Sequence, residues 1–128
     1  MTRATFILVL SLLMLTNCKK EVRTQSLEVT ATAYNSVASQ TNRDHPTITA
    51  WGDELKPGMK CIAVSRDLIG LGLKHKTKVK IEGLPGRYLV LDKMDQRWTK
   101  KIDIYMGNDV EAARNWGKRK VTITWNIE

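Results

Sequence analysis

The stretch that decides the fold is residues 92–105, which read Asp-Lys-Met-Asp-Gln-Arg-Trp-Thr-Lys-Lys-Ile-Asp-Ile-Tyr. This stretch closes one apolar strand with Asp92 and places Asp103 inside the next strand. Side chains alternate along a strand, so the isoleucines beside Asp103 would face one side and Asp103 the other. A polar loop with Trp98 and several cationic side chains separates the two acids. The segment thus predicts two strands that each carry an aspartate.

Similar short stretches extend this pattern in both directions along the chain. They have apolar residues at alternate positions or in short runs, and turn-forming Gly and Pro residues separate them. The six predicted strands are residues 27–34, 61–65, 78–82, 87–91, 102–105 and 121–125. One short helix is predicted after Asn108, its expected cap, with Gly117 as its stop. These elements predict a mainly β fold, a small six-stranded closed barrel with one short helix, because closure removes exposed strand edges.

The N-terminal segment is typical of an export signal. Arg3 is the only charge before the apolar run 6–15, which is too short to span a bilayer. The run ends at Leu15-Thr16-Asn17-Cys18, which resembles a bacterial lipobox and predicts that Cys18 is lipidated. An ordinary secretory signal with an incidental cysteine is the alternative.

These features divide the chain into three predicted regions: a lipoprotein signal peptide at 1–17, a lipid-anchor tether at 18–26 and a folded domain at 27–128. The expected location is the bacterial cell envelope, with the protein attached to the membrane through Cys18. Lys19 stands where an aspartate would retain the protein at the inner membrane, so an outer-membrane anchor facing the periplasm is predicted.

The composition narrows the expected partners. The chain has 21 Lys and Arg against 13 Asp and Glu, a formal net charge of +8. Export argues against nucleic acid, so acidic envelope polymers or anionic lipid headgroups are expected instead. Cys61, the other cysteine, lies in an apolar run and is predicted to be a buried, inert thiol. The only histidines, His45 and His75, lie far apart in the sequence, so we expect no metal site and no cofactor.

Four pieces of the chain, taken in order, resemble the three-aspartate (3D) domain family, which belongs to the double-psi β-barrels. The pieces are Val29-Thr30-Ala31-Thr32-Ala33-Tyr34, Cys61-Ile62-Ala63-Val64-Ser65, Val79-Lys80-Ile81-Glu82-Gly83, and residues 92–105 followed by Ala113-Arg114-Asn115-Trp116-Gly117. The family includes the catalytic domain of membrane-bound lytic transglycosylase A and stationary-phase muralytic proteins. The resemblance spans residues 29–125 and implies a 3D-type double-psi β-barrel.

The resemblance also implies a reaction, the cleavage of peptidoglycan between N-acetylmuramic acid and N-acetylglucosamine with a 1,6-anhydro product. By position, Asp103 matches the family's catalytic acid/base and Asp92 matches its second aspartate. The family commonly has Asp-Pro after the strand at 61–65, where this chain has Ser65-Arg66, so Asp67 is the candidate for the first aspartate. Met94 stands where the family tends to have a glycine.

A proton donor of this kind needs a raised pKa, which desolvation or a nearby like charge can supply. We expect Asp92, with Asp67 as a further candidate, to raise the pKa of Asp103. Four nearby cations would oppose the shift if they pointed inward, so we expect them to face solvent or substrate: Lys93, Arg97, Lys100 and Lys101.

Residues predicted to bind the glycan surround the acids. Trp98 and Trp51 lie in loops where an aromatic face can stack on a sugar, although tryptophan also closes small cores. Arg97 and Tyr105 complete the predicted substrate-binding set, whereas the two remaining tryptophans are expected to pack inside the barrel.

Two other functions remain open. The first is a non-catalytic peptidoglycan-binding module on the same barrel, and the second is a structural lipoprotein that organises other envelope proteins. A barrel of this size builds only one wall of a cleft, so a long glycan would need a partner domain or a homodimer to enclose it.

Overall fold

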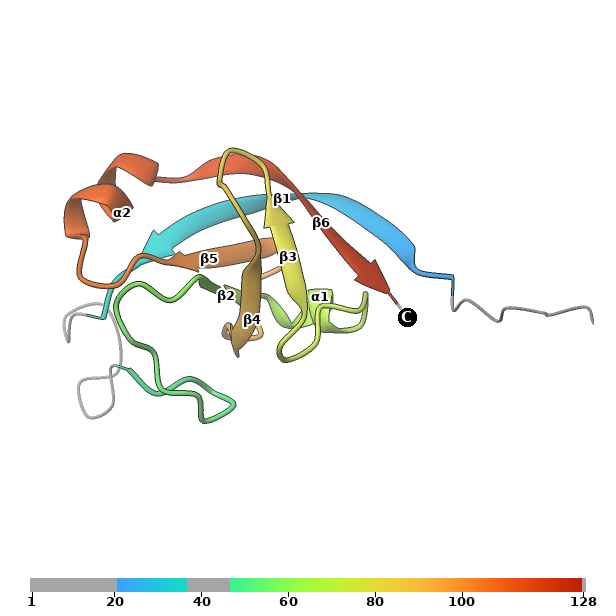
Figure 1. Ribbon diagram of the computed structural model, residues 1–128, viewed down its shortest axis with the longest axis horizontal. Coiled ribbons are helices and arrows are strands. Elements are labelled where there is room, and N and C mark those ends of the chain that lie inside the picture. Colours follow the sequence, from blue (N-terminus) through green and yellow to red (C-terminus); the bar gives the residue numbers. More distant parts are fainter. Residues whose placement is uncertain (1–20, 37–46, 128) are drawn as a thin grey trace, which may run out of the picture.

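The protein is a closed six-stranded β-barrel with two short helices (Figure 1). The computed structural model describes residues 21–36 and 47–127. Its elements are β1 (Arg23–Tyr34), β2 (Cys61–Val64), α1 (Arg66–Ile69), β3 (Lys78–Ile81), β4 (Tyr88–Lys93), β5 (Lys101–Tyr105), α2 (Val110–Trp116) and β6 (Arg119–Ile127). The strands close in the order β1-β5-β2-β4-β3-β6. The predicted six-stranded barrel is confirmed, with α1 as a second short helix that the sequence did not predict.

Alternating side chains fill the interior of the barrel. Val29 and Ala31 of β1 point inward, and the buried isoleucines of β5 meet them from the neighbouring strand. The fully buried side chains come from every strand, from α1 and from the loop after it, and the largest are Ile62, Leu68, Leu73, Ile81, Ile102, Ile104 and Ile123. Trp116 and Trp125 are also buried, as predicted.

The first strand begins earlier than the sequence predicted. Residues 23–26 pair with residues 124–127 of β6, so they belong to the barrel and not to the predicted tether at 18–26. Their side chains are all exposed, which removes the alternating pattern that marks a strand. Backbone hydrogen bonds to β6 hold this part of β1 without burying side chains. The signal peptide and Cys18 lie outside the described residues.

The helix α2 closes the barrel at the end where β1 finishes (Figure 1). Its cap is Asp109 and not the predicted Asn108, because the Asp109 carboxylate accepts the Ala112 N–H at 2.9 Å. The indole N–H of Trp116 donates to the Ala31 carbonyl at 3.3 Å and ties the helix to β1. Within residues 21–36 and 47–127, neither helix is long and apolar enough to cross a membrane.

Candidate functional site

The two aspartates lie in one row of side chains on the outer surface of the barrel. Thr32 of β1 pairs with Asp103 of β5, Asp103 pairs with Ala63 of β2, and Ala63 pairs with Asp92 of β4. Paired residues share a face of the sheet, and the neighbours of Asp103 along β5 point into the core. The two acids therefore face outward on either side of Ala63, two strand spacings or about 10 Å apart at the Cα atoms.

A β-bulge brings Asp92 into this row. The register between β2 and β4 shifts between Ile62 and Ala63, so that Ile62 pairs with Val90 but Ala63 pairs with Asp92. Leu91 is the extra residue on β4. Without this bulge, strict alternation from the buried Val90 would turn Asp92 inward. The bulge is thus the local feature that makes Asp92 a neighbour of Asp103.

Burial dominates the environment of Asp103. Desolvation is the largest influence on the Asp103 carboxyl and raises its pKa above the usual value for aspartate. A hydrogen bond from the Thr32 hydroxyl at 3.0 Å and the positive charge of Lys101 oppose this shift, while the negative charge of Asp92 adds to it. The predicted effect of Asp92 on the Asp103 pKa has the expected direction, although burial is the larger effect. Lys101, which was predicted to face solvent or substrate, is half-buried, and its charge lowers the Asp103 pKa.

Thr32→Val tests this balance by removing the hydroxyl while nearly keeping the shape of the side chain. We expect the pKa of Asp103 to rise further, because the Thr32 hydrogen bond favours the charged form. The measurement is an NMR titration of the Asp103 side-chain carboxyl carbon. Thr32→Ser is the matched control and should keep the wild-type pKa. An unchanged or lower pKa in the valine variant would contradict the assignment.

Asp92 is held by backbone groups. Its Oδ1 atom accepts the N–H of Ala50 at 2.8 Å and the N–H of Lys93 at 2.9 Å. Burial nevertheless raises the Asp92 pKa, and the negative charge of Asp53 adds to the rise. The bond to Ala50 fixes the loop before β2 against β4, so Asp92 anchors the loop that borders the site.

A second apolar cluster lies beside the acid row on the outer surface. It consists of Leu55, Cys61, Leu91 and Tyr105, with Tyr34, Met59 and Leu89 packed against it. These side chains exclude water from one side of the acids and supply the desolvation described above. The prediction of a buried Cys61 is confirmed, and burial raises the pKa of its thiol to about 12.

Tyr105 belongs to this cluster and does not face open solvent. Only 3% of the residue is exposed, its ring lies 5.4 Å from the ring of Tyr34, and its hydroxyl bonds to Ser36. The sequence predicted Tyr105 as a substrate-binding residue because it shares the face of Asp103. In the structure that face is covered at residue 105, so Tyr105 supports the site from beneath.

Tyr34 is a site residue that the sequence analysis missed. Its hydroxyl is buried and has no hydrogen-bond partner within the part of the chain that the structure describes. Burial raises the Tyr34 pKa, and so do the charges of Cys61, Asp92 and Asp103. The hydroxyl therefore stays protonated beside both acids. The alternation of β1 places Tyr34 on the face of Thr32, but only the parallel pairing of β1 with β5 brings it to the acids.

Trp98 lies near the acid row through Lys101. The Lys101 ammonium is 3.6 Å and the Arg97 guanidinium 4.9 Å from the centre of the Trp98 ring, both within the range of cation–π contacts. Trp98 is 37% exposed, as a sugar platform requires. Lys101 also lowers the pKa of the Asp103 carboxyl, so the same cation interacts with the exposed ring and with the acid.

Trp51 lies on the other side of the row. Its ring is 5.0 Å from the ring of His75, and the Lys93 ammonium is 5.7 Å from its centre. Trp51 is half-buried and packs against the core. His75 Nε2 bonds to the Asp53 carboxylate at 2.5 Å. The negative charge of Asp53 in turn raises the pKa of Asp92. Trp51 and His75 thus lie beside Asp92.

Asp67 lies at the start of α1 and is exposed. Its carboxylate accepts the N–H of Lys100 at 2.9 Å and so holds the turn before β5. The charges that shift the pKa of Asp103 come from Lys101 and Asp92. The structure therefore places Asp92 near Asp103, whereas Asp67 contacts the turn at Lys100. Across residues 21–36 and 47–127, no group of three or more His, Cys, Asp or Glu side chains is arranged to hold a metal ion.

Comparison with known proteins supports the fold. No protein-family model matches the chain, and no curated protein matches its sequence. Among solved structures, the chain is similar to an apo expansin of Clavibacter michiganensis, at 19% sequence identity and a TM-score of 0.52. The match covers 81% of this chain and 51% of the expansin chain, so this chain spans about half the length of that protein. The expansin is a double-psi β-barrel, which confirms the predicted fold, whereas membership of the three-aspartate family stays a prediction.

Proposed function

We propose that this chain is a cell-envelope protein that cleaves peptidoglycan glycan strands as a lytic transglycosylase does, with Asp103 as the proton carrier. The observation that carries the proposal is the outward-facing, desolvated Asp103 carboxyl, whose pKa burial raises. A general acid must hold its proton near the working pH, and burial is one of the ways to achieve this. The likeness to an expansin supports a cell-wall role at the level of the fold.

The reaction uses one carboxyl in two steps. Asp103 donates its proton to the glycosidic oxygen as the bond from that oxygen to C1 of the muramic acid breaks. The resulting carboxylate then takes the proton of the C6 hydroxyl while the C6 oxygen bonds to C1. The products are a 1,6-anhydro-muramic acid end and a free hydroxyl on N-acetylglucosamine, and Asp103 is protonated again. No water attacks, so the second catalytic carboxylate of ordinary glycosidases is unnecessary.

The remaining acids position and tune Asp103. Asp92 already accepts two backbone N–H groups on one oxygen, which suits it to hold the loop at Ala50 and to disfavour the charged form of Asp103. Asp67 holds the turn before β5 and so fixes the start of the strand that carries Asp103. In this proposal both acids are positioning residues. The deciding experiment is digestion of purified peptidoglycan followed by mass spectrometry, in which anhydro-muropeptides support the proposal and intact glycan opposes it.

The exposed ring of Trp98 favours a second function, a glycan-binding module without activity. In either function we expect Trp98→Ala to weaken binding to insoluble peptidoglycan by about tenfold, because the loss of one stacking platform removes on the order of 1 kcal/mol or more. Co-sedimentation measures this, with Trp98→Phe as the control that keeps an aromatic ring. The non-catalytic module predicts binding without fragment release in the wild type, and equal binding by all three forms would remove Trp98 from the site.

We also propose that the protein is a lipoprotein anchored through Cys18, in the outer membrane facing the periplasm. The support is the lipobox-like sequence at the end of the apolar run. Intact-mass measurement should find a diacylglyceryl-modified chain that begins at Cys18 in the membrane fraction. Cys18→Ala should lack this mass and leave the membrane, and a membrane-bound, unmodified alanine variant would contradict the anchor.

A further inference from the structure

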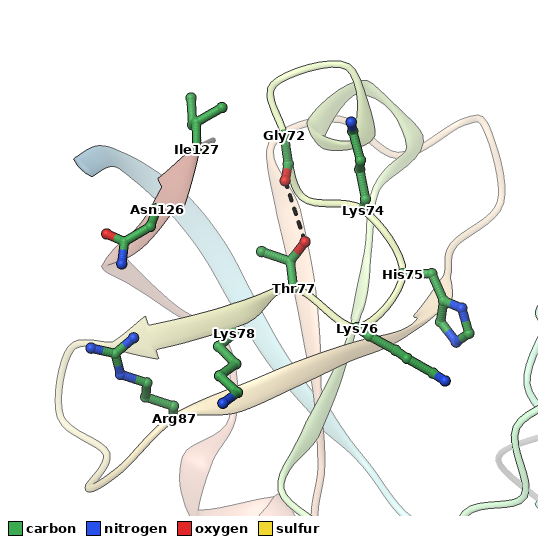
Figure 2. Close-up of a pocket in the computed structure, with 9 residues that line it drawn as sticks. All are labelled: Gly72, Lys74, His75, Lys76, Thr77, Lys78, Arg87, Asn126 and Ile127. Carbon is green, nitrogen blue, oxygen red and sulfur yellow. Dashed lines mark hydrogen bonds between the residues drawn. The ribbon is translucent and has the colours of Figure 1, made fainter. Parts of the chain in front are cut away.

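A basic hollow lies on the barrel surface away from the acid row, and it is outside the proposed catalytic site. Its volume is about 450 Å³, and Figure 2 shows the nine residues that line it. Four of them are cations from the β3 approach, β3 and the start of β4, and none is acidic: Lys74, Lys76, Lys78 and Arg87. His75, Thr77, Gly72, Asn126 and Ile127 complete the wall. The hollow is therefore open to solvent, and the described residues that line it carry charge of a single sign.

The strand pairing explains how Lys78 and Arg87 come together. Val79 of β3 pairs with Trp125 of β6 and with Tyr88 of β4, so Lys78 lies next to Asn126 and Arg87 directly precedes the paired Tyr88. Figure 2 shows Lys78 on β3, Arg87 just before β4 and Asn126 on β6, with Lys76 and His75 pointing to the other side. The Asn126 Oδ1 atom accepts the Thr24 hydroxyl at 3.1 Å, which turns the amide nitrogen into the available donor.

None of the four cations forms an ion pair with an acidic side chain in the part of the chain that the structure describes. In residues 21–36 and 47–127 the single ion pair within 4.0 Å joins His75 to Asp53, at the side of the hollow nearest the acid row. All four side chains are exposed, so their positive charges remain available to an anion from solution. Guanidinium and ammonium groups beside an amide donor match the oxygens of phosphate groups.

Lys76 provides a further observation at the same place. Its φ angle is +70°, a backbone conformation that favours glycine, while its N–H donates to the Val90 carbonyl at 2.7 Å. A lysine at such a position costs stability that glycine would not. The protein thus has a cation at a position where glycine would be less strained, and this residue lines the basic hollow.

We propose that this hollow is a binding site for a phosphate-bearing polyanion in solution, separate from the acid site. Among the described residues that line the hollow, Ile127 is the one large apolar side chain, so this lining lacks the apolar residues with which a protein enters a lipid surface. Its volume exceeds that of one phosphate and accommodates several linked phosphate groups. This proposal does not depend on the chemistry of Asp103. A result that contradicts the polyanion site would therefore leave the proposed glycan cleavage unaffected, and the reverse also holds.

The probe is tripolyphosphate, with binding to the full chain measured by isothermal titration calorimetry. We expect the wild type to bind and Lys78→Ala/Arg87→Ala to bind at least about tenfold more weakly, because two charge-assisted contacts are lost. The control is Lys120→Ala, an exposed lysine of β6 that pairs with Thr30 away from the hollow. This variant removes one positive charge, and its affinity for tripolyphosphate should stay within about twofold of the wild-type affinity.

Lys76→Gly separates binding from folding. It removes a cation of the hollow and relieves the left-handed backbone, so we expect weaker tripolyphosphate binding with an equal or higher melting temperature. Three results would overturn the proposal. They are no binding by the wild type, an equal loss in Lys120→Ala and the double variant, or binding to vesicles of phosphatidylcholine with phosphatidylglycerol in the absence of any binding to soluble tripolyphosphate.

Discussion

Asp103→Asn should stop the release of anhydro-muropeptides from purified peptidoglycan while the barrel stays folded. The amide has the shape of the carboxyl, and its oxygen can still accept the Thr32 hydroxyl, but it has no acidic proton to transfer to the glycosidic oxygen. Loss of a general acid typically lowers a rate by about 10²–10⁴-fold. Mass spectrometry of the digest measures the loss, and Asp95→Asn is the matched control. Asp95 is an exposed acid whose carboxylate accepts the Arg97 N–H within its own loop, so this variant should retain activity.

The same substitution should change the dependence of stability on pH. The pKa of Asp103 is raised in the folded state, so the native protein holds this proton at pH values where the unfolded chain has released it. The cost to stability is absent below the unfolded pKa, grows as the pH rises through the folded pKa, and is complete above it. Asp103→Asn lacks this cost. Its free energy of unfolding should therefore equal or exceed that of the wild type at neutral pH, and the advantage should vanish in acid.

Retained activity in a correctly folded Asp103→Asn variant would contradict the proton-carrier role. A variant that is inactive because it unfolds would instead have a lower melting temperature than the wild type, and thermal melts of both proteins at neutral pH distinguish these cases. If wild type and variant both bind peptidoglycan without releasing fragments, the barrel is a binding module.

The position of Asp103 could be predicted from the sequence, whereas the position of Asp92 could not. Alternation in β5 puts Asp103 opposite two buried isoleucines, and alternation is a local property of any strand. Asp92 reaches the same face only because the bulge at Ile62 and Ala63 shifts the register. A bulge depends on pairing between strands that lie far apart in the sequence, so no pattern within β4 marks it.

The cause of the raised pKa was also beyond the sequence. The sequence named desolvation and a nearby like charge as possible causes and could not rank them. In the structure burial is the larger effect, and Leu91, Cys61 and Tyr105, which come from three strands, form an apolar cluster on the same side of the sheet as the acids. Desolvation is a collective result of packing, so it becomes visible only when the strands are in place. The exposed start of β1 escaped prediction for a related reason, because backbone pairing alone holds it.

The packing beneath the acid row leads to the prediction with the largest effect on stability, for the substitution Ile104→Ala. Ile104 is completely buried, and it pairs with Ala33 of β1 and Ile62 of β2 at the centre of the closed barrel. Removing a buried isoleucine side chain to its Cβ typically costs about 2–5 kcal/mol in the free energy of unfolding. At about 4–8 °C per kcal/mol for a domain of this size, the melting temperature should fall by about 10 °C or more.

Ile104→Val and Leu71→Ala are the controls for this effect. The valine removes one methyl group and should cost about 0.5–1.5 kcal/mol, while Leu71 is exposed and its truncation should change stability by about 0.5 kcal/mol or less. Equal melting temperatures for Ile104→Ala and Leu71→Ala would contradict the core assignment. Ile104 lies between Asp103 and Tyr105 on β5, so a cavity there loosens the strand that holds the acid. Below its melting point, Ile104→Ala should therefore also lower the pKa of Asp103, as water gains access to the carboxyl.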